Sequence, residues 1–172
     1  EFIMMSILQK LMQEISEDNI ESTLTEEFLH KYNLWIEDGG ATTINGFKKL
    51  PKEEQEFLLD YLNDLSVYER ITVNNQNYIL VHSLPDNLQN GNDLNYQIEE
   101  IIFGRPDFTA SWNQEDIYII GHTPTFKIPG AESGKIYRRN NLIDIDCGCV
   151  TGHALCAYCI DTGETFYEPF FV

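Results

Sequence analysis

The spacing of apolar residues changes near residue 66, and this change constrains the fold more than any other feature of the chain. Before it, apolar residues recur every three or four positions, as they do along one face of an α-helix. After it, they stand in short runs rich in β-branched and aromatic side chains, which is typical of strands. The sequence therefore predicts one domain over residues 1–172, helical over 1–66 and mainly stranded over 67–172.

Three helices are expected in the first part. The apolar face of the first extends over residues 3–15. Thr25, followed by two glutamates, is typical of the N-cap of the second helix, which we expect to end near Gly39-Gly40. Pro51 is suited to the first turn of the third.

Short strands are expected in the second part, over residues 68–73, 77–82, 117–120, 142–146, 153–160 and 164–171. The first two would form a hairpin, and a short helix is expected over residues 95–103. The fold class predicted from this order is α/β (α+β), with helices laid on a mixed sheet.

The chain is strongly acidic, with 28 Asp and Glu against 11 Lys and Arg and a formal net charge of −17. Nucleic acids and anionic membranes need a basic protein face, so we expect neither as a partner. No apolar run approaches the ~18 residues of a membrane span. The four cysteines lie together between residues 147 and 159, which is not typical of a disulfide scaffold, so a cytoplasmic location is expected.

Two apolar runs each end in a histidine that a proline follows closely. Residues 78–81 end in His82, and residues 118–120 pass through Gly121 to His122. Ligands of open α/β sheets bind just beyond the carboxyl ends of the strands, so these two side chains could point into one site. Imidazole is a common metal ligand and a general acid or base. The alternative for each histidine is a hydrogen-bonded residue at a strand end.

Residues 80–85, with the sequence Leu-Val-His-Ser-Leu-Pro, and Gly121-His122-Thr123-Pro124 carry a resemblance to a known family. The first resembles a shortened L-V-H-A-G-L-x-P segment, and the second matches the G-H-T-P box, of the metallophosphoesterases of the bacterial phosphoprotein phosphatase (calcineurin-like) type. Residues 143–150 resemble the I-D-I-D-x-G strand, and residues 35–43 resemble W-x-x-N-G-G-x-x-T. Residues 1–3 resemble the last three positions of the G-N-H-E-x-M segment, with Ile3 in place of Met. The five segments occur in the family's order and span essentially the whole chain.

The resemblance implies a β-sandwich flanked by helices, with two metal ions (manganese, iron or zinc) at the strand ends. It implies metal-activated water that hydrolyses a phosphate monoester, with a phosphoprotein or a nucleotide as substrate. His82 and His122 would be ligands of one metal, and Arg105 would hold the substrate phosphate. The residues expected to border the site are Gly39, Gly40, Gly121, Thr123 and Asp146.

The sequence also departs from the family. The G-D-x-H-G and G-D-x-x-D-R-G boxes, which supply most metal ligands, have no counterpart in the 172 residues. The expectation is therefore the C-terminal part of a phosphatase that lacks its N-terminal strands, binds metal weakly or not at all, and does not catalyse alone. We assign no catalytic residue within it. An unpaired sheet edge would favour a homodimer or strand exchange. The alternative is a non-catalytic remnant or interaction module with the same fold.

Other groups could carry different chemistry. The four cysteines, at positions 147, 149, 156 and 159, invite a zinc site. On a strand, however, the first two would share a face and the last two would not, so core packing is the favoured interpretation. Asp144 and Asp146 are expected to accept hydrogen bonds beside the site, and His153 is expected to be solvated.

Overall fold

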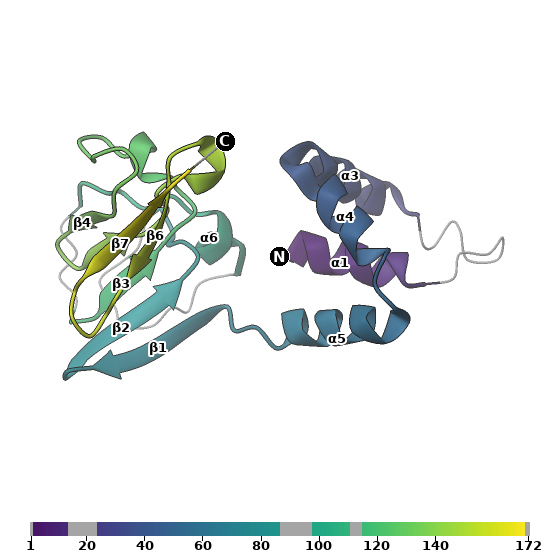
Figure 1. Cartoon of the computed structure of the whole chain (residues 1–172), viewed down its shortest axis with the longest axis horizontal. Coiled ribbons are helices and arrows are strands. Elements are labelled where there is room, and N and C mark those ends of the chain that lie inside the picture. Colours follow the sequence, from purple (N-terminus) through teal and green to yellow (C-terminus); the bar gives the residue numbers. More distant parts are fainter. Residues whose placement is uncertain (1, 14–23, 87–97, 111–114, 171–172) are drawn as a thin grey trace. The chain divides into compact units, whose positions relative to one another are not determined.

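The computed structural model describes residues 2–13, 24–86, 98–110 and 115–170 (Figure 1). The chain divides into two compact units, Glu1–Leu65 and Ser66–Val172, and each is described by itself. Within the described part of the chain, no helix combines the length and the apolar character that a membrane span requires. Residues 14 and 15 of the first expected apolar face lie outside the described residues, as do residues 95–97 of the expected short helix over 95–103.

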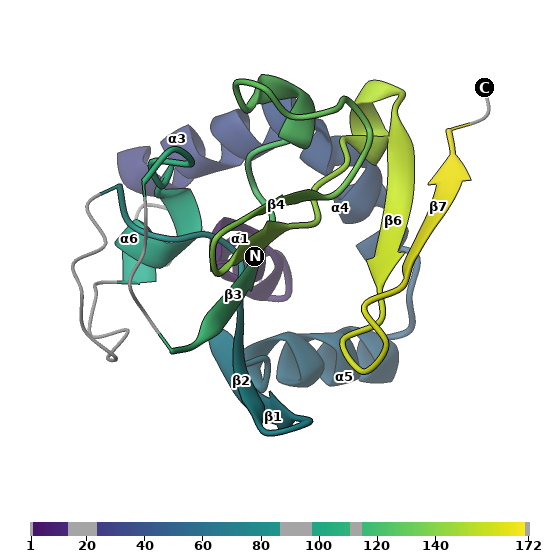
Figure 2. The same ribbon diagram turned by 90° about the vertical axis from the view of Figure 1, so that its left-hand side faces the viewer.

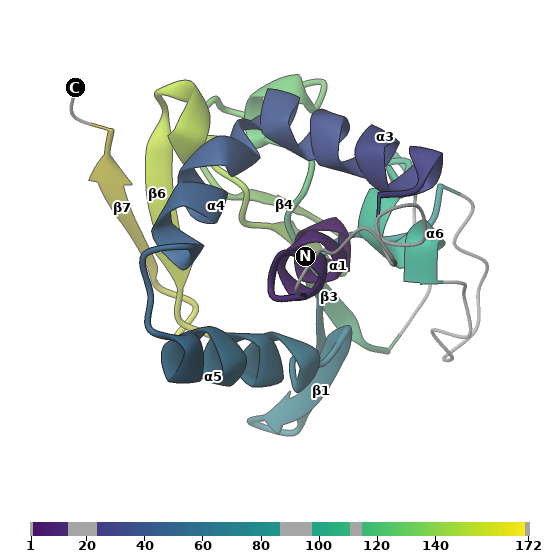
Figure 3. The same ribbon diagram turned by 90° about the vertical axis from the view of Figure 1, so that its right-hand side faces the viewer.

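The first unit is helical, as the periodicity predicts. Its elements are α1 (Phe2–Leu11), α3 (Glu26–Trp35), the π-helical turn η1 (Ile36–Gly40), α4 (Ala41–Phe47) and α5 (Lys52–Asn63). The helix α1 contacts both α3 and α5 (Figure 3). The N-cap at Thr25 is confirmed, since its hydroxyl accepts the backbone N–H of Phe28 at 3.2 Å. Buried Ile7 and Leu8 of α1 supply the apolar face that the spacing indicates.

The expected helix end at Gly39-Gly40 is a kink. Gly39 has a φ of 92°, which breaks the helical path, but α4 then begins directly at Ala41. A Cβ on Gly40 would come within 2.5 Å of the Trp35 ring, so glycine allows this ring to lie against the backbone. The two glycines therefore have a local structural role, and α4 is a helix that the sequence did not predict.

The second unit is built on a five-stranded sheet. Its strands are β1 (Tyr68–Val73), β2 (Gln76–Val81), β3 (Ile117–Ile120), β4 (Tyr137–Arg139) and β5 (Leu142–Asp144), in the spatial order β1-β2-β3-β5-β4. The central strands β2, β3 and β5 are parallel, and the edge strands β1 and β4 are antiparallel to their neighbours. The mixed α and β character expected from the sequence is thus confirmed.

The hairpin between β1 and β2 turns through two residues. Val73 pairs with Gln76, and Asn74 and Asn75 have φ values of 52° and 63°. Two successive residues with positive φ make the turn type that matches the twist of a hairpin, and asparagine tolerates this conformation better than most side chains. The sequence predicted this hairpin with a turn one residue longer.

Both faces of the central sheet are covered. On one face, α6 (Ile98–Phe103) contributes Ile101 to a core that includes Ile79, Tyr118 and Leu142. The other face packs against the separate antiparallel pair β6 (Ala154–Tyr158) and β7 (Thr165–Pro169), as Figures 1 and 2 show. Double coverage explains why the sequences of β2 and β3 are continuous apolar runs.

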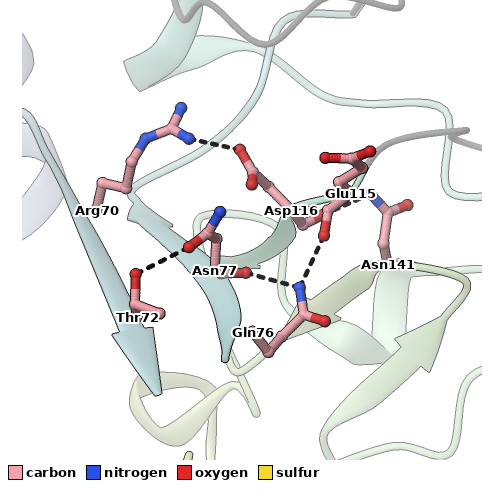
Figure 4. A network of polar contacts seen from close by, with 7 residues as sticks. All are labelled: Arg70, Thr72, Gln76, Asn77, Glu115, Asp116 and Asn141. Atoms are coloured by element: carbon pink, nitrogen blue, oxygen red, sulfur yellow. Dashed lines mark hydrogen bonds and ion pairs between the residues drawn. The ribbon is translucent and has the colours of Figure 1, made fainter. Parts of the chain in front are cut away.

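A polar network fixes the amino end of β3 to its neighbours (Figure 4). Arg70 of β1 donates to the carboxylate of Asp116 at 2.8 Å, across the intervening strand β2. Asn141 donates to the backbone carbonyl of Asp116 at 2.8 Å, and Gln76 donates to that of Glu115 at 2.7 Å. The Asp116 carboxylate is buried, so its ion pair compensates the loss of water. This end of the sheet is thereby held by side chains, while the opposite end carries the histidines.

Candidate functional site

The carboxyl ends of β2, β3 and β5 meet at one edge of the sheet, as parallel strands require. His82 follows β2 directly, and His122 follows β3 after Gly121. The backbone N–H of Gly121 donates to the carbonyl of His82 at 3.0 Å, so the two segments continue side by side beyond the strands. Asp146 follows β5 at the same edge. The expected convergence of the two histidines is therefore found.

The two imidazole rings are in contact. His82 Nε2 lies 3.0 Å from His122 Nδ1, with the ring centroids 4.9 Å apart and the planes inclined by 61°. This separation fits a hydrogen bond in which one nitrogen donates. It also fits a shared cation, because nitrogens 3.0 Å apart subtend about 91–97° at an ion that lies ~2.0–2.1 Å from each. That angle matches two adjacent positions of an octahedral ion.

The backbone at His122 is strained. Its φ is 68°, and the N–H of Thr123 donates to the carbonyl of Gly121 at 2.8 Å, which closes a tight three-residue turn around the histidine. Turns of this kind with positive φ are rare and cost energy in a residue with a Cβ. The surrounding strands hold the turn, and it aims the ring at His82. Strain of this kind clusters at functional sites.

Arg105 is held next to the segment that follows His82. The Asp86 carboxylate accepts the backbone N–H of Arg105 at 2.6 Å, and the Ser83 hydroxyl donates to the carbonyl of Gly104. Gly104 packs so tightly that a Cβ would clash with the backbone carbonyls of Leu84 and Glu100. The sequence indicated Arg105 but missed Ser83 and Asp86, whose role as anchors depends on contacts about twenty residues away.

Several neighbouring charged groups shift the pKa of His122. Burial, the neighbouring His82 and the charge of Arg105 lower the pKa of His122, and Lys127 acts in the same direction with a smaller effect. The Asp146 carboxylate opposes them. Lys127 is the last residue of η2 (Thr125–Lys127) and is exposed, and no sequence motif indicated it. Its only signal was its position three residues after the G-H-T-P box.

Asp144 and Asp146 act as hydrogen-bond acceptors, as expected. Asp144 Oδ1 accepts the backbone N–H of Asp146 at 2.9 Å, and Asp146 Oδ1 accepts that of Gly148 at 3.0 Å. Asp144 is fully buried, and its second oxygen has no partner among the described residues. Burial raises the pKa of Asp144 to about 8, so it is largely protonated at neutral pH.

Two more buried side-chain oxygens without a described hydrogen-bond partner lie next to this edge of the sheet. Thr123 and Thr125 are buried, and their hydroxyl oxygens lack a partner within the described part of the chain. The backbone N–H of Thr125 donates to the carbonyl of Asp146 at 2.8 Å, which ties η2 to the end of β5. The segment after His122 is thus fixed on both sides.

The four cysteines form no group of three or more potential metal ligands among the described residues. Cys149 lies in η3 (Cys149–Thr151) and not on a strand, so the expected shared face with Cys147 is wrong. Cys147 is buried, and the Cys156 thiol donates to the carbonyl of Ile145 at 2.8 Å. Burial raises the pKa of Cys147 to about 12, which disfavours the thiolate that zinc requires. Core packing accounts for Cys147, whereas Cys149, Cys156 and Cys159 are half-buried.

No group of three or more His, Cys, Asp or Glu side chains that could hold a metal ion occurs among the described residues. The site described above lies entirely in the second unit. Gly39 and Gly40 belong to the first unit, so their position at the mouth of the site stays a prediction.

No family model matches the chain, and no curated protein matches it significantly. The resemblance to metallophosphoesterases therefore depends on the five sequence segments alone. The geometry of the histidine pair is a separate observation that bears on the same chemistry.

Proposed function

We propose that this chain carries one part of the active site of a metal-dependent phosphomonoesterase. The observation that carries the proposal is the 3.0 Å separation of His82 Nε2 and His122 Nδ1 at adjacent parallel strand ends. Two imidazoles in this arrangement would bind one divalent cation in adjacent positions. The sequence resemblance supports manganese, iron or zinc as that cation.

The residues present fit a single ion only in part. His82 and His122 supply two ligands, and the described residues include no cluster that would complete a two-metal centre. We therefore expect weak metal binding and no hydrolysis by this chain alone, with the remaining ligands coming from outside the described residues. A bound metal would supply an activated water and charge neutralisation.

Arg105 and Lys127 would bind the phosphate of the substrate. Both side chains are exposed, and both positive charges lower the pKa of His122. Arg105 can present two parallel N–H groups to phosphate oxygens, whereas Lys127 adds a point charge. The negative charges of Asp86 and Asp146 balance these two positive charges. The four groups together are about neutral, although the chain carries a net charge of −17. One bound divalent cation would make the site positive, which suits a phosphoprotein or a nucleotide.

A non-catalytic module with the same fold is the second candidate. The observation that favours it is the absence of a third metal ligand beside the histidine pair among the described residues. In that case the contact between His82 and His122 would be a hydrogen bond. Arg105 and Lys127 could still bind the phosphate group of a phosphorylated partner.

Calorimetric titration with Mn²⁺ and Zn²⁺ tests the metal part of the proposal. We expect one ion per chain, lost in both His82→Ala and His122→Ala. His30→Ala, which removes an exposed histidine of α3, is the matched control and should bind as the unaltered chain does. Binding that survives both substitutions would show that the pair is not a ligand pair, and no detectable binding would overturn the expected weak binding by this chain alone.

Hydrolysis tests the catalytic part. We expect no turnover of p-nitrophenyl phosphate by this chain, and Mn²⁺-dependent turnover by the longest product translated from its gene, abolished by His122→Ala. A longer product that binds metal but remains inactive would favour the non-catalytic module.

A further inference from the structure

Two aromatic rings, one of them next to Lys127, take no part in the chemistry described so far. The rings of Phe126 in η2 and His153 at the start of β6 have centroids 4.6 Å apart, inclined by 45°. A Cβ on Gly148 would come within 2.9 Å of the His153 ring and 3.0 Å of the Phe126 ring, so both rings pack on the backbone of Gly148. His153 is half-buried, so the expected solvation is only partial.

This aromatic pair, Phe126 and His153, is continuous with the histidine site. The backbone N–H of Gly148 donates to Asp146 Oδ1 at 3.0 Å. The Cβ of Asp146 in turn lies 3.7 Å from the position of a Cβ on Gly121, the residue before His122. The aromatic pair is therefore joined to the turn that carries His122 through Gly148 and Asp146.

The side chain of Lys127 connects the aromatic pair with the histidine site. Lys127 Nζ lies 5.8 Å from the centroid of the Phe126 ring, within cation–π distance. The same ammonium group acts on His122. The side chain of Phe126 remains partly exposed although it is large and apolar, at 36 %. An exposed ring, next to an ammonium group and a phosphate site, is suited to an aromatic ligand that carries a negative charge.

We propose that the aromatic pair binds the alcohol part of the phosphate ester, and that it selects esters in which an aromatic ring is bonded directly to the phosphate oxygen. Such aryl phosphates include the phosphotyrosyl group. This proposal rests on the proposed function, because Arg105 and Lys127 hold the phosphate in it. The ring of the ester would then lie against Phe126, where offset or edge contacts between aromatic rings are favourable.

The position of Phe126 favours an aryl ester over a nucleotide. Phe126 follows His122 by four residues, through a turn whose backbone is tied to Asp146. The aromatic surface thus begins next to Lys127, one of the two residues proposed to bind the phosphate. A ring attached directly to the phosphate oxygen reaches such a surface, whereas a nucleobase is held farther off by its ribose.

Binding of three small probes to the whole chain tests the proposal without requiring turnover. The probes are inorganic phosphate, methyl phosphate and phenyl phosphate, followed by backbone-amide NMR shifts of Gly121, Lys127 and Gly148. Phenyl phosphate should bind about 3–10-fold more tightly than methyl phosphate, the range expected for one aromatic contact. Phe126→Leu should remove this preference and leave the binding of inorganic phosphate unchanged.

Controls separate this inference from the proposed function. Phe166→Leu alters an exposed ring of β7 and should leave all three affinities unchanged. If inorganic phosphate does not bind, or binds equally well after Arg105→Ala, the proposed phosphate site is wrong and the aryl subsite falls with it. If phosphate binds but phenyl and methyl phosphate bind equally, the aryl subsite alone is wrong. Tighter binding of AMP than of phenyl phosphate, sensitive to Phe126→Leu, would also overturn the aryl preference.

Discussion

His82 Nε2 and His122 Nδ1 lie 3.0 Å apart at the carboxyl ends of two neighbouring parallel strands. The sheet determines where His82 lies, since it continues directly from β2. The position of the His122 ring depends in addition on a strained turn with a φ of 68°. The conformation of one partner of the pair is therefore energetically costly, and this has a measurable consequence.

Replacing His122 by glycine should yield a more stable protein than replacing it by alanine. Both substitutions remove the ring, but only glycine adopts a φ of 68° without a steric cost. We expect a difference of about 1 kcal/mol in the free energy of unfolding by urea. At exposed Ala157 of β6 the order should reverse, with Ala157→Gly less stable than alanine. Equal stabilities of the two His122 variants would mean that the turn is not strained.

The ring of His122 should titrate below its ordinary pKa of 6.5. Burial, His82 and the charge of Arg105 all lower this pKa. Below pH 6.5 the unfolded chain therefore binds more protons at this residue than the folded one, and this contribution to stability is lost as the pH falls. An NMR titration of the ring measures the effect directly. Arg105→Ala should move the midpoint upward, and a midpoint unaffected by this substitution would place Arg105 too far away to share a phosphate with the pair.

The buried carboxyl of Asp144 should make the protein less stable as the pH rises from 3.8 to about 8. Its pKa is raised by burial from 3.8 to about 8, so between these values the folded state holds a proton that the unfolded state has released. The unfolded state binds fewer protons, and stability falls as the pH rises, by at most about 1.4 kcal/mol per pH unit. Asp144→Asn keeps an oxygen that can accept the N–H of Asp146 and removes the titration. In urea unfolding at pH 5 and pH 8, the variant should lose less stability than the unaltered chain. The same loss in both would show that Asp144 is ionised in the folded state.

The sequence was sufficient to predict the elements that have a strong local pattern. The hairpin β1–β2 and the strand β3 follow from β-branched runs between turn residues, and the N-cap at Thr25 follows from its hydroxyl and the two acidic residues behind it. The sequence also indicated that His82 and His122 share a site, because both follow apolar runs that must be buried on two faces.

Other features depend on contacts that no local pattern encodes. The strand β4 has three residues, two of them arginines, and pairs with β5 while Arg138 lies 4.4 Å from the Tyr158 ring of β6. Lys127 and Asp86 acquire a role only when the segments after β2 and β3 are brought together. The kink at Gly39 was expected as a helix end, since positive φ at a glycine usually terminates a helix and nothing near it signals that α4 continues.

Gly104→Ala should damage the fold and the site together. A Cβ at this position would clash with the backbone carbonyls of Leu84 and Glu100, which cannot move away as a flexible side chain could. We expect a loss of ~2 kcal/mol or more in the free energy of unfolding, together with weaker phosphate binding, because the neighbouring Arg105 must shift. Gly46→Ala is the matched control. Gly46 lies in α4 with no heavy atom within 4 Å of the added Cβ, so alanine should stabilise the protein by about 0.4–1 kcal/mol. Urea unfolding of both variants measures the contrast, and a Gly104→Ala variant as stable as the unaltered chain would show that the segment from Ser83 to Asp86 does not hold Arg105 rigidly.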